Sequence, residues 1–228
     1  LPETGERFEG VLPPITFAPT FAIRKRAAGV IPLARYVADG IMSAAQAAFL
    51  KASVLQRRNV IVAGGTSTGK TTLANALLQE IAATGDRVLV LEDTIELQCV
   101  ADDHVALRTK ANTVSTADLV RSTLRLRPDR IVVGEVRGAE ALDLLKAWGT
   151  GHPGGLATLH AGSAHGALIR LEQLIQEAVV TVPRALIAEA VDVIVFIAGR
   201  GSKRRIQEII RVTGLDGDAY AIEHVTGA

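Results

Sequence analysis

One short segment, GGTSTGKT at residues 64–71, constrains the fold of this chain more than any other. Its spacing, G-x-x-x-x-G-K-[ST], falls between a β-branched run, NVIVAGG (59–65), and a helical pattern, KTTLANALLQEIAATG (70–85). In that context the glycines let the backbone curl so that its N–H groups face a phosphate. The following helix adds the positive end of its dipole. The segment therefore predicts a phosphate-binding turn between a buried strand and a helix.

Each position in this turn has an expected task. Lys70 is expected to reach the β- and γ-phosphates of a nucleoside triphosphate, and the Thr71 hydroxyl to bind Mg²⁺. ATP and Mg²⁺ are accordingly the expected cofactors, and an ordinary glycine-rich turn is the alternative. The residues expected to contact the nucleotide here are Gly65, Thr66, Ser67, Thr68, Gly69, Lys70, Thr71 and Thr72.

The rest of the chain alternates between short apolar runs and helical patterns, which predicts an α/β fold. Such alternation is typical of a mostly parallel sheet with helices on both faces. The other predicted strands are 87–93, 130–136, 154–161 and 190–198, the other predicted helices are 43–56, 115–128, 138–151 and 165–179, and a hairpin over 204–212 and 220–225 follows.

The first part of the chain has a different composition. Five of the eight prolines lie within residues 1–32, around one strand-like segment, TFAIRKR. We predict that residues 1–28 are the remnant of an N-terminal domain, 29–42 a linker, and 43–228 the α/β domain.

Composition excludes several classes of protein. The net charge of +1 gives no whole-chain attraction to nucleic acid or anionic lipid. The single cysteine, Cys99, cannot form an internal disulfide, which fits a reducing compartment. No apolar run approaches the ~20 residues of a membrane span. We expect a cytoplasmic protein.

Carboxylates follow two of the predicted strands. Glu135 ends the run RIVVGEV, where a glutamate suits a general base that orients water toward the γ-phosphate. Glu92, Asp93 and Glu96 follow the strand before it, and Mg²⁺ with its waters would relieve their repulsion. A solvated loop is the alternative for this acidic group, and Glu92 is the second candidate for the base.

Four segments together resemble a known family. GGTSTGKTT, VLEDTIEL, LRLRPDRIVVGEVRGAEA and TGHPGGLATLHA resemble the Walker A, Asp box, Walker B and His box of the traffic ATPases of type II and type IV secretion and pilus systems. The resemblance covers residues 16–228 and implies a RecA-like P-loop NTPase core that hydrolyses ATP. It also implies a homo-hexamer that works with inner-membrane secretion machinery, with peripheral membrane association allowed.

The resemblance also assigns histidines and arginines. It implies that His160 approaches the γ-phosphate, whereas a lone histidine in an apolar setting is usually a core residue. His152 matches the same motif and is expected to order its glycine-rich loop. Arg24 and Arg108 are expected near phosphate and Arg137 beside the base, while Arg121 and Arg125 are expected nearer a subunit contact. The cluster GRGSKRR (199–205) is interpreted as a solvated turn.

Three alternatives stay open at this point. Within the family, the segments resemble both the conjugal-transfer ATPases and the Tad pilus assembly ATPases. Outside it, a RecA-like nucleic-acid motor would carry a basic, aromatic strand-binding loop, but aromatic residues are only 4% of the chain and no such loop is visible. Direct nucleic-acid binding is therefore not expected. A nucleotide-binding switch without turnover would not need Glu135 and His160.

Overall fold

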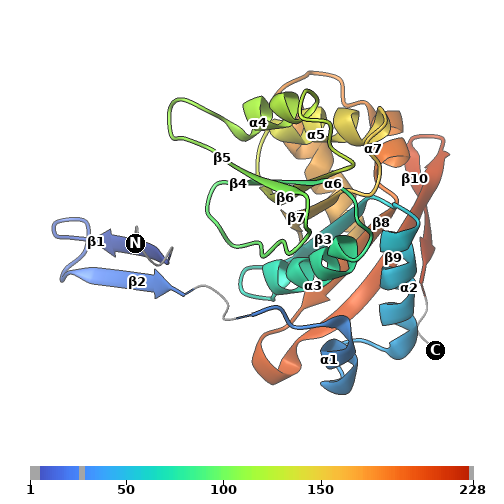
Figure 1. Ribbon diagram of the computed structural model, residues 1–228. Helices are drawn as coiled ribbons and strands as arrows, with labels where there is room; N and C mark the ends of the chain where they lie inside the picture. Colours follow the sequence, from blue (N-terminus) through green and yellow to red (C-terminus); the bar gives the residue numbers. More distant parts are fainter. Residues whose placement is uncertain (1–5, 26–28, 226–228) are drawn as a thin grey trace.

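The computed structural model describes residues 6–25 and 29–225. Parts of the predicted N-terminal remnant, residues 1–5 and 26–28, lie outside the described residues. Within that remnant, β1 (Arg7–Val11) pairs antiparallel with β2 (Thr20–Arg24) as a separate two-stranded sheet. The sequence predicts only one strand here. In Figure 1 this hairpin stands apart from the main body.

The main body is built on an eight-stranded sheet in the order β10-β9-β8-β3-β7-β6-β4-β5. From β8 to β5 every neighbouring pair is parallel, and β9 and β10 are antiparallel additions at one edge. The predicted mostly parallel sheet is therefore confirmed. The strands are β3 (Val60–Gly64), β4 (Val88–Glu92), β5 (His104–Arg108), β6 (Arg130–Val136), β7 (Leu156–His160), β8 (Val193–Ala198), β9 (Arg205–Asp216) and β10 (Ala219–His224).

Helices cover both faces of the sheet, as the sequence predicts (Figure 1). Each face has its own apolar core, one under the first three helices and one under the last four. One face carries α1 (Leu33–Ala38), α2 (Ala44–Leu55) and α3 (Lys70–Ala82), and the other carries α4 (Thr116–Thr123), α5 (Glu140–Gly149), α6 (Ala164–Gln176) and α7 (Arg184–Ala190). A single 3₁₀ turn, η1 (Gly201–Lys203), precedes β9.

The central strands are easy to predict because they are apolar throughout. β3 and β4 are buried along their whole length, which is what helices on both faces require. β5 was not predicted: it is an edge strand whose side chains alternate between exposed and half-buried. The short helices α1 and α7 were not predicted either, since six or seven residues give too little periodicity.

Helix α1 lies inside the segment predicted as a linker, residues 29–42. Its Leu33 and Tyr36 are buried in the core beneath α2 and α3. Burial raises the pKa of the Tyr36 phenol to about 12, with Arg204 acting in the opposite direction. This half of the segment is thus packed against the α/β domain, and the division at residues 28 and 42 remains a prediction.

An ionic network around the buried Arg130 lies at the edge of the sheet opposite the phosphate-binding turn. Arg130, at the start of β6, is 1% exposed; its Nε donates to Asp86 Oδ2 at 2.6 Å and its Nη1 to the carbonyls of Val54 and Gly154. Arg57 and Thr84 donate to the same carboxylate. Burial alone would raise the pKa of Asp86, but these hydrogen bonds and charges hold it below its ordinary value of 3.8.

We predict that Asp86→Ala lowers the free energy of unfolding by about 3 kcal/mol, because it leaves the buried Arg130 charge without its carboxylate. Since the folded pKa is depressed, this stabilisation is complete above pH 3.8 and is lost as the pH falls through the folded-state value. Urea denaturation at several pH values should show the gap to wild type closing in acid.

Asp103→Ala is the matched control, because Asp103 pairs with Arg87 at the surface. It should cost no more than about 1 kcal/mol. Equal losses for the two variants would contradict a special role for the Asp86–Arg130 pair.

Candidate functional site

The carboxyl ends of four neighbouring parallel strands, β3, β7, β6 and β4, meet at one edge of the sheet. The pairing of β3 with β7 sets Gly64 opposite His160. A cavity of about 470 Å³ opens at this edge. Ligands of open α/β sheets bind at this kind of position, so the cavity is the candidate site.

The phosphate-binding turn forms the floor of the cavity. Gly69 has φ +100°, a left-handed conformation that glycine adopts without strain, and α3 begins at the next residue. Of the predicted contact residues, those that line the cavity are Thr66, Ser67, Gly69, Lys70, Thr71 and Thr72. Gly65 and Thr68 do not line it; the Thr68 hydroxyl donates to the Gly65 carbonyl at 3.0 Å, which fixes the turn.

Lys70 is mostly buried, and its Nζ donates to the Gly65 carbonyl at 2.8 Å. Burial lowers the pKa of this ammonium; Arg24 lowers it further, and Glu135 and Glu96 act in the opposite direction. The charge therefore sits in a partly desolvated place beside two carboxylates. A bound polyanion would relieve that desolvation cost directly.

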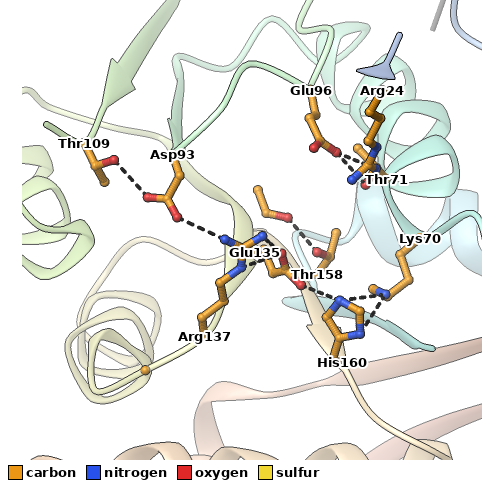
Figure 2. Close-up of polar contacts among 12 residues, drawn as sticks. Arg24, Lys70, Thr71, Asp93, Glu96, Thr109, Glu135, Arg137, Thr158 and His160 are labelled. Atoms are coloured by element: carbon orange, nitrogen blue, oxygen red, sulfur yellow. Dashed lines mark hydrogen bonds and ion pairs between the residues drawn. The ribbon is translucent and has the colours of Figure 1, made fainter. Parts of the chain in front are cut away.

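His160, at the end of β7, lies between Lys70 and Glu135 (Figure 2). Lys70 Nζ is 3.4 Å from both ring nitrogens, and Nε2 is 2.7 Å from Glu135 Oε1. Burial and the neighbouring Lys70 charge lower the pKa of His160, while Glu135 opposes them. The imidazole is therefore neutral at pH 7 and can both donate and accept a hydrogen bond.

The two carboxylate oxygens of Glu135 have different surroundings. Oε2 accepts a hydrogen bond from Arg137 Nε at 2.6 Å. Oε1 is buried, and its contact with His160 has ion-pair distance but not hydrogen-bond alignment, so no donor within the described residues satisfies it. A buried carboxylate oxygen without a donor is costly. His160 Nε2 lies 2.7 Å from this oxygen, and the Glu135 side chain lines the cavity, so a shift of the imidazole would let water reach the carboxylate, as a general base needs.

A second group of residues lies on the opposite wall of the cavity. Arg24, at the end of β2, forms an ion pair of 2.8 Å with Glu96 Oε2, and the Thr71 hydroxyl donates to the same oxygen at 3.3 Å (Figure 2). Glu92 Oε1 accepts the backbone N–H groups of Glu96 and Leu97 at 2.9 and 2.8 Å. Glu92 therefore shapes the loop after β4.

Asp93 is the remaining acidic residue of that loop. Its Oδ1 accepts from the Thr109 hydroxyl at 2.9 Å and its Oδ2 from Arg137 Nη1 at 3.4 Å. Arg137 thus links Asp93 to Glu135. The part of the chain that the structure describes contains no group of three His, Cys, Asp or Glu residues able to hold a metal ion by itself.

The donor set nevertheless fits Mg²⁺ bound together with a nucleotide. Mg²⁺ keeps several waters and takes few protein ligands beside phosphate oxygens. The Thr71 hydroxyl, with the Glu96 carboxylate 3.3 Å away, supplies such ligands on the cavity wall. The expected roles of Glu92 and Asp93 as ligands, in part through water, remain predictions.

Some expected site residues lie elsewhere. Arg108 lines a separate pocket beside β5 and is not among the residues that line the cavity. His152 precedes β7, so it lies at the opposite edge of the sheet from His160; its Nδ1 contacts the Pro128 carbonyl at 3.0 Å. Arg121, on α4, pairs with Asp143 of the same chain, and Arg125 follows that helix.

One arginine at the site was misread from the sequence. The GRGSKRR cluster was interpreted as a solvated turn, but Arg204 lines the cavity and packs against Gly69. Arg200 Nη2 donates to the Thr66 carbonyl at 3.1 Å. The turn comes back to the phosphate loop because β8 pairs with β3, a neighbour that local sequence does not reveal. Lys203 and Arg205 are exposed, as a solvated turn requires.

Comparisons with known proteins agree on one family. Residues 10–200 match the family described as "Type II/IV secretion system protein". "Conjugal transfer protein TrbB" of Rhizobium radiobacter is 51% identical over 226 residues, 98% of this chain and 70% of that protein. "Type IV secretion system protein PtlH" of Bordetella pertussis is 36% identical over 251 residues, 92% of this chain and 73% of that protein.

A solved structure is similar in fold as well as in sequence. The VirB11 ATPase of the Brucella suis type IV secretion system superposes with a TM-score of 0.68 at 31% identity, over 92% of this chain and 71% of that one.

The two histidines of the segment GHPGGLATLHA lie at opposite edges of the sheet, and their substitution by alanine should affect stability differently. We predict that His152→Ala lowers the free energy of unfolding by about 1 kcal/mol, because the buried Pro128 carbonyl loses its partner. His160→Ala should change it by less than about 0.5 kcal/mol, since that side chain is 48% exposed. Chemical denaturation of both variants measures this, and a larger loss for His160→Ala would mean that His160 is a core residue.

Proposed function

The chain belongs to the type II/IV secretion system protein family, and on this premise we propose that it is an ATP-hydrolysing motor of a type IV secretion apparatus. The observation that carries the proposal is the meeting of Lys70, His160 and Glu135 beside the phosphate loop, at the carboxyl ends of three adjacent strands. These side chains supply a phosphate-binding cation, a neutral hydrogen-bonding group and a carboxylate base within one cavity.

The proposed chemistry is the attack of water on the γ-phosphorus of ATP. Glu135 Oε1, which lacks a donor within the described residues, would accept a proton from that water and orient it. Lys70 would stabilise negative charge on the β- and γ-phosphates as the bond to the leaving ADP breaks. His160, neutral at pH 7, would donate a hydrogen bond to a γ-phosphate oxygen and so distinguish ATP from ADP.

Arg137 holds the proposed base before nucleotide binds. Its guanidinium contacts Glu135 Oε2 and Asp93 at the same time. This pairing occupies Oε2 and leaves Oε1 as the oxygen without a hydrogen-bond donor among the described residues. Thr71 would hold Mg²⁺, which, when bound, would screen the charge between the phosphates.

Conjugation is the role within the family that we propose. The relative with 51% identity is named a conjugal transfer protein, and the relative with 36% identity is named a type IV secretion system protein. The pilus-assembly alternative has no better support among these relatives.

The proposed place of action is the cytoplasmic side of the inner membrane, together with the secretion machinery. Within residues 6–25 and 29–225, no helix is both long and apolar enough to cross a bilayer. We propose that contact with the membrane is peripheral or through components of that machinery.

Two variants test the proposed chemistry. Lys70→Ala should abolish nucleotide binding, because the charge that offsets the phosphates is gone. Glu135→Gln should keep ATP affinity and reduce turnover by ~10²-fold or more, the usual size for a lost general base. Calorimetric titration with ATP and a phosphate-release assay measure the two effects, and normal turnover by Lys70→Ala would overturn the proposal.

We also propose that the working unit is a ring, a homo-hexamer. Closed heterologous rings set one subunit's surface against the next subunit's nucleotide, and Arg121 and Arg125 lie outside this chain's own cavity, where they can serve a neighbour. Wild-type protein mixed with Lys70→Ala protein should then lose more activity than dilution alone explains. A strictly proportional fall, with a monomer in light scattering in the presence of ATP, would overturn the ring.

A further inference from the structure

Two buried side-chain atoms stand out among the described residues, because they are the two that have no hydrogen-bond partner. They are Glu135 Oε1 and Arg204 Nε. Both side chains line the same cavity, although they come from different parts of the chain. The proposed function explains the first, since water would bind there, but it gives no partner to the second. A buried guanidinium N–H without an acceptor costs free energy unless something binds to it.

Arg204 lies directly against the phosphate loop. A Cβ added to Gly69 would be 3.0 Å from Arg204 Nε and 3.2 Å from its Cζ, so the guanidinium packs on the glycine that precedes Lys70. Arg200, from the same turn, donates to the Thr66 carbonyl at 3.1 Å and joins the turn to the loop. The turn follows β8, which pairs with β3 along its whole length. The position of Arg204 is therefore set by the sheet.

The strand order tells which end of a nucleotide Arg204 would meet. β3, which carries the phosphate loop, lies between β7 and β8. His160 and Glu135, the proposed γ-phosphate residues, come from β7 and β6 on one side of β3. Arg204 comes from the turn after β8 on the other side. A nucleotide whose γ-phosphate faces His160 would thus direct its α-phosphate and nucleoside toward Arg204.

We propose that Arg204 is a nucleotide-binding residue that donates to the α-phosphate–nucleoside end of the ligand, the part that ATP and ADP share. This proposal rests on the proposed function, because it assumes a nucleotide on the phosphate loop. Guanidinium is suited to the task, since its planar fork bonds phosphate oxygens in pairs and stacks on aromatic rings. The ligand would also supply acceptors to the guanidinium, which lines the cavity and whose Nε reaches one only by turning away from Gly69.

The test compares Arg204→Gln with wild type in calorimetric titrations with Mg²⁺·ADP and Mg²⁺·ATP. Affinity for both should fall about tenfold or more, by the same factor, because the lost contact is to their common part. His160→Ala should weaken ATP alone. Inorganic pyrophosphate, which can fill the two terminal phosphate positions but has neither α-phosphate nor nucleoside, should compete equally well for Arg204→Gln and wild-type protein.

Arg205→Gln is the matched control, because Arg205 is exposed and its Nη1 bonds only local carbonyls, those of Ser202 and Arg204. It should leave affinity for ADP unchanged. Arg204→Lys keeps the positive charge but lacks the planar guanidinium group, so its affinity for ADP should lie between those of Arg204→Gln and wild type. Thermal unfolding of ligand-free Arg204→Gln should match that of wild type.

Three results would overturn the inference. One is unchanged ADP affinity in Arg204→Gln. Another is an equal loss of pyrophosphate binding, which would place Arg204 on the terminal phosphates. The third is a loss of ligand-free stability as large as the loss of affinity, which would make Arg204 a structural support of the loop. If wild type itself bound no nucleotide, or if Lys70→Ala bound it normally, the proposed function would fall first and this inference with it.

Discussion

The parallel register of β3, β7, β6 and β4 is the constraint on which the rest of the site depends. It brings Lys70 within 3.4 Å of His160, although 90 positions separate them in the chain. The register is held because these strands are buried on both faces by two apolar cores, one on each side of the sheet. A slip of one residue would move every side chain of a strand from one core into the other and so break the close packing of both. The two apolar cores therefore fix the relative positions of Lys70, His160 and Glu135 before any ligand binds.

The residues that line the cavity include equal numbers of cationic and acidic side chains, four of each. Its cations are Lys70 and three arginines, Arg24, Arg137 and Arg204, and its acids are Glu92, Asp93, Glu96 and Glu135. Arg24 pairs with Glu96, and Arg137 pairs with Glu135 and Asp93. A polyanion that enters competes with these carboxylates for the arginines. Binding is then an exchange of partners, in which phosphate oxygens take the place of carboxylate oxygens as acceptors from the guanidinium groups.

Sequence reasoning predicted the parts of this protein that local pattern controls, and missed those that depend on distant pairing. The phosphate turn and the buried strands follow from glycine spacing and apolar runs, so their positions were predictable. His152 and His160 belong to one motif. His152 precedes β7 and His160 is its last residue, so the two side chains lie at opposite edges of the sheet. Arg204 could not be found at all, because its contact with Gly69 requires the pairing of β8 with β3. Edge strand β5 lacks the apolar continuity that marks the central strands.

The hairpin of β1 and β2 contributes Arg24 to the cavity wall while exposing apolar side chains. Phe8 and Phe21 stack with ring centroids 6.0 Å apart, and both are more than half exposed. Burying a phenylalanine is worth roughly 1.5–3 kcal/mol. The ion pair of Arg24 with Glu96 is solvent-exposed on the arginine side, and such pairs are worth at most about 1 kcal/mol. A surface that covered these two rings would therefore outweigh Glu96 in deciding where Arg24 lies, and the affinity of this cavity for an anion would then depend on what the hairpin contacts.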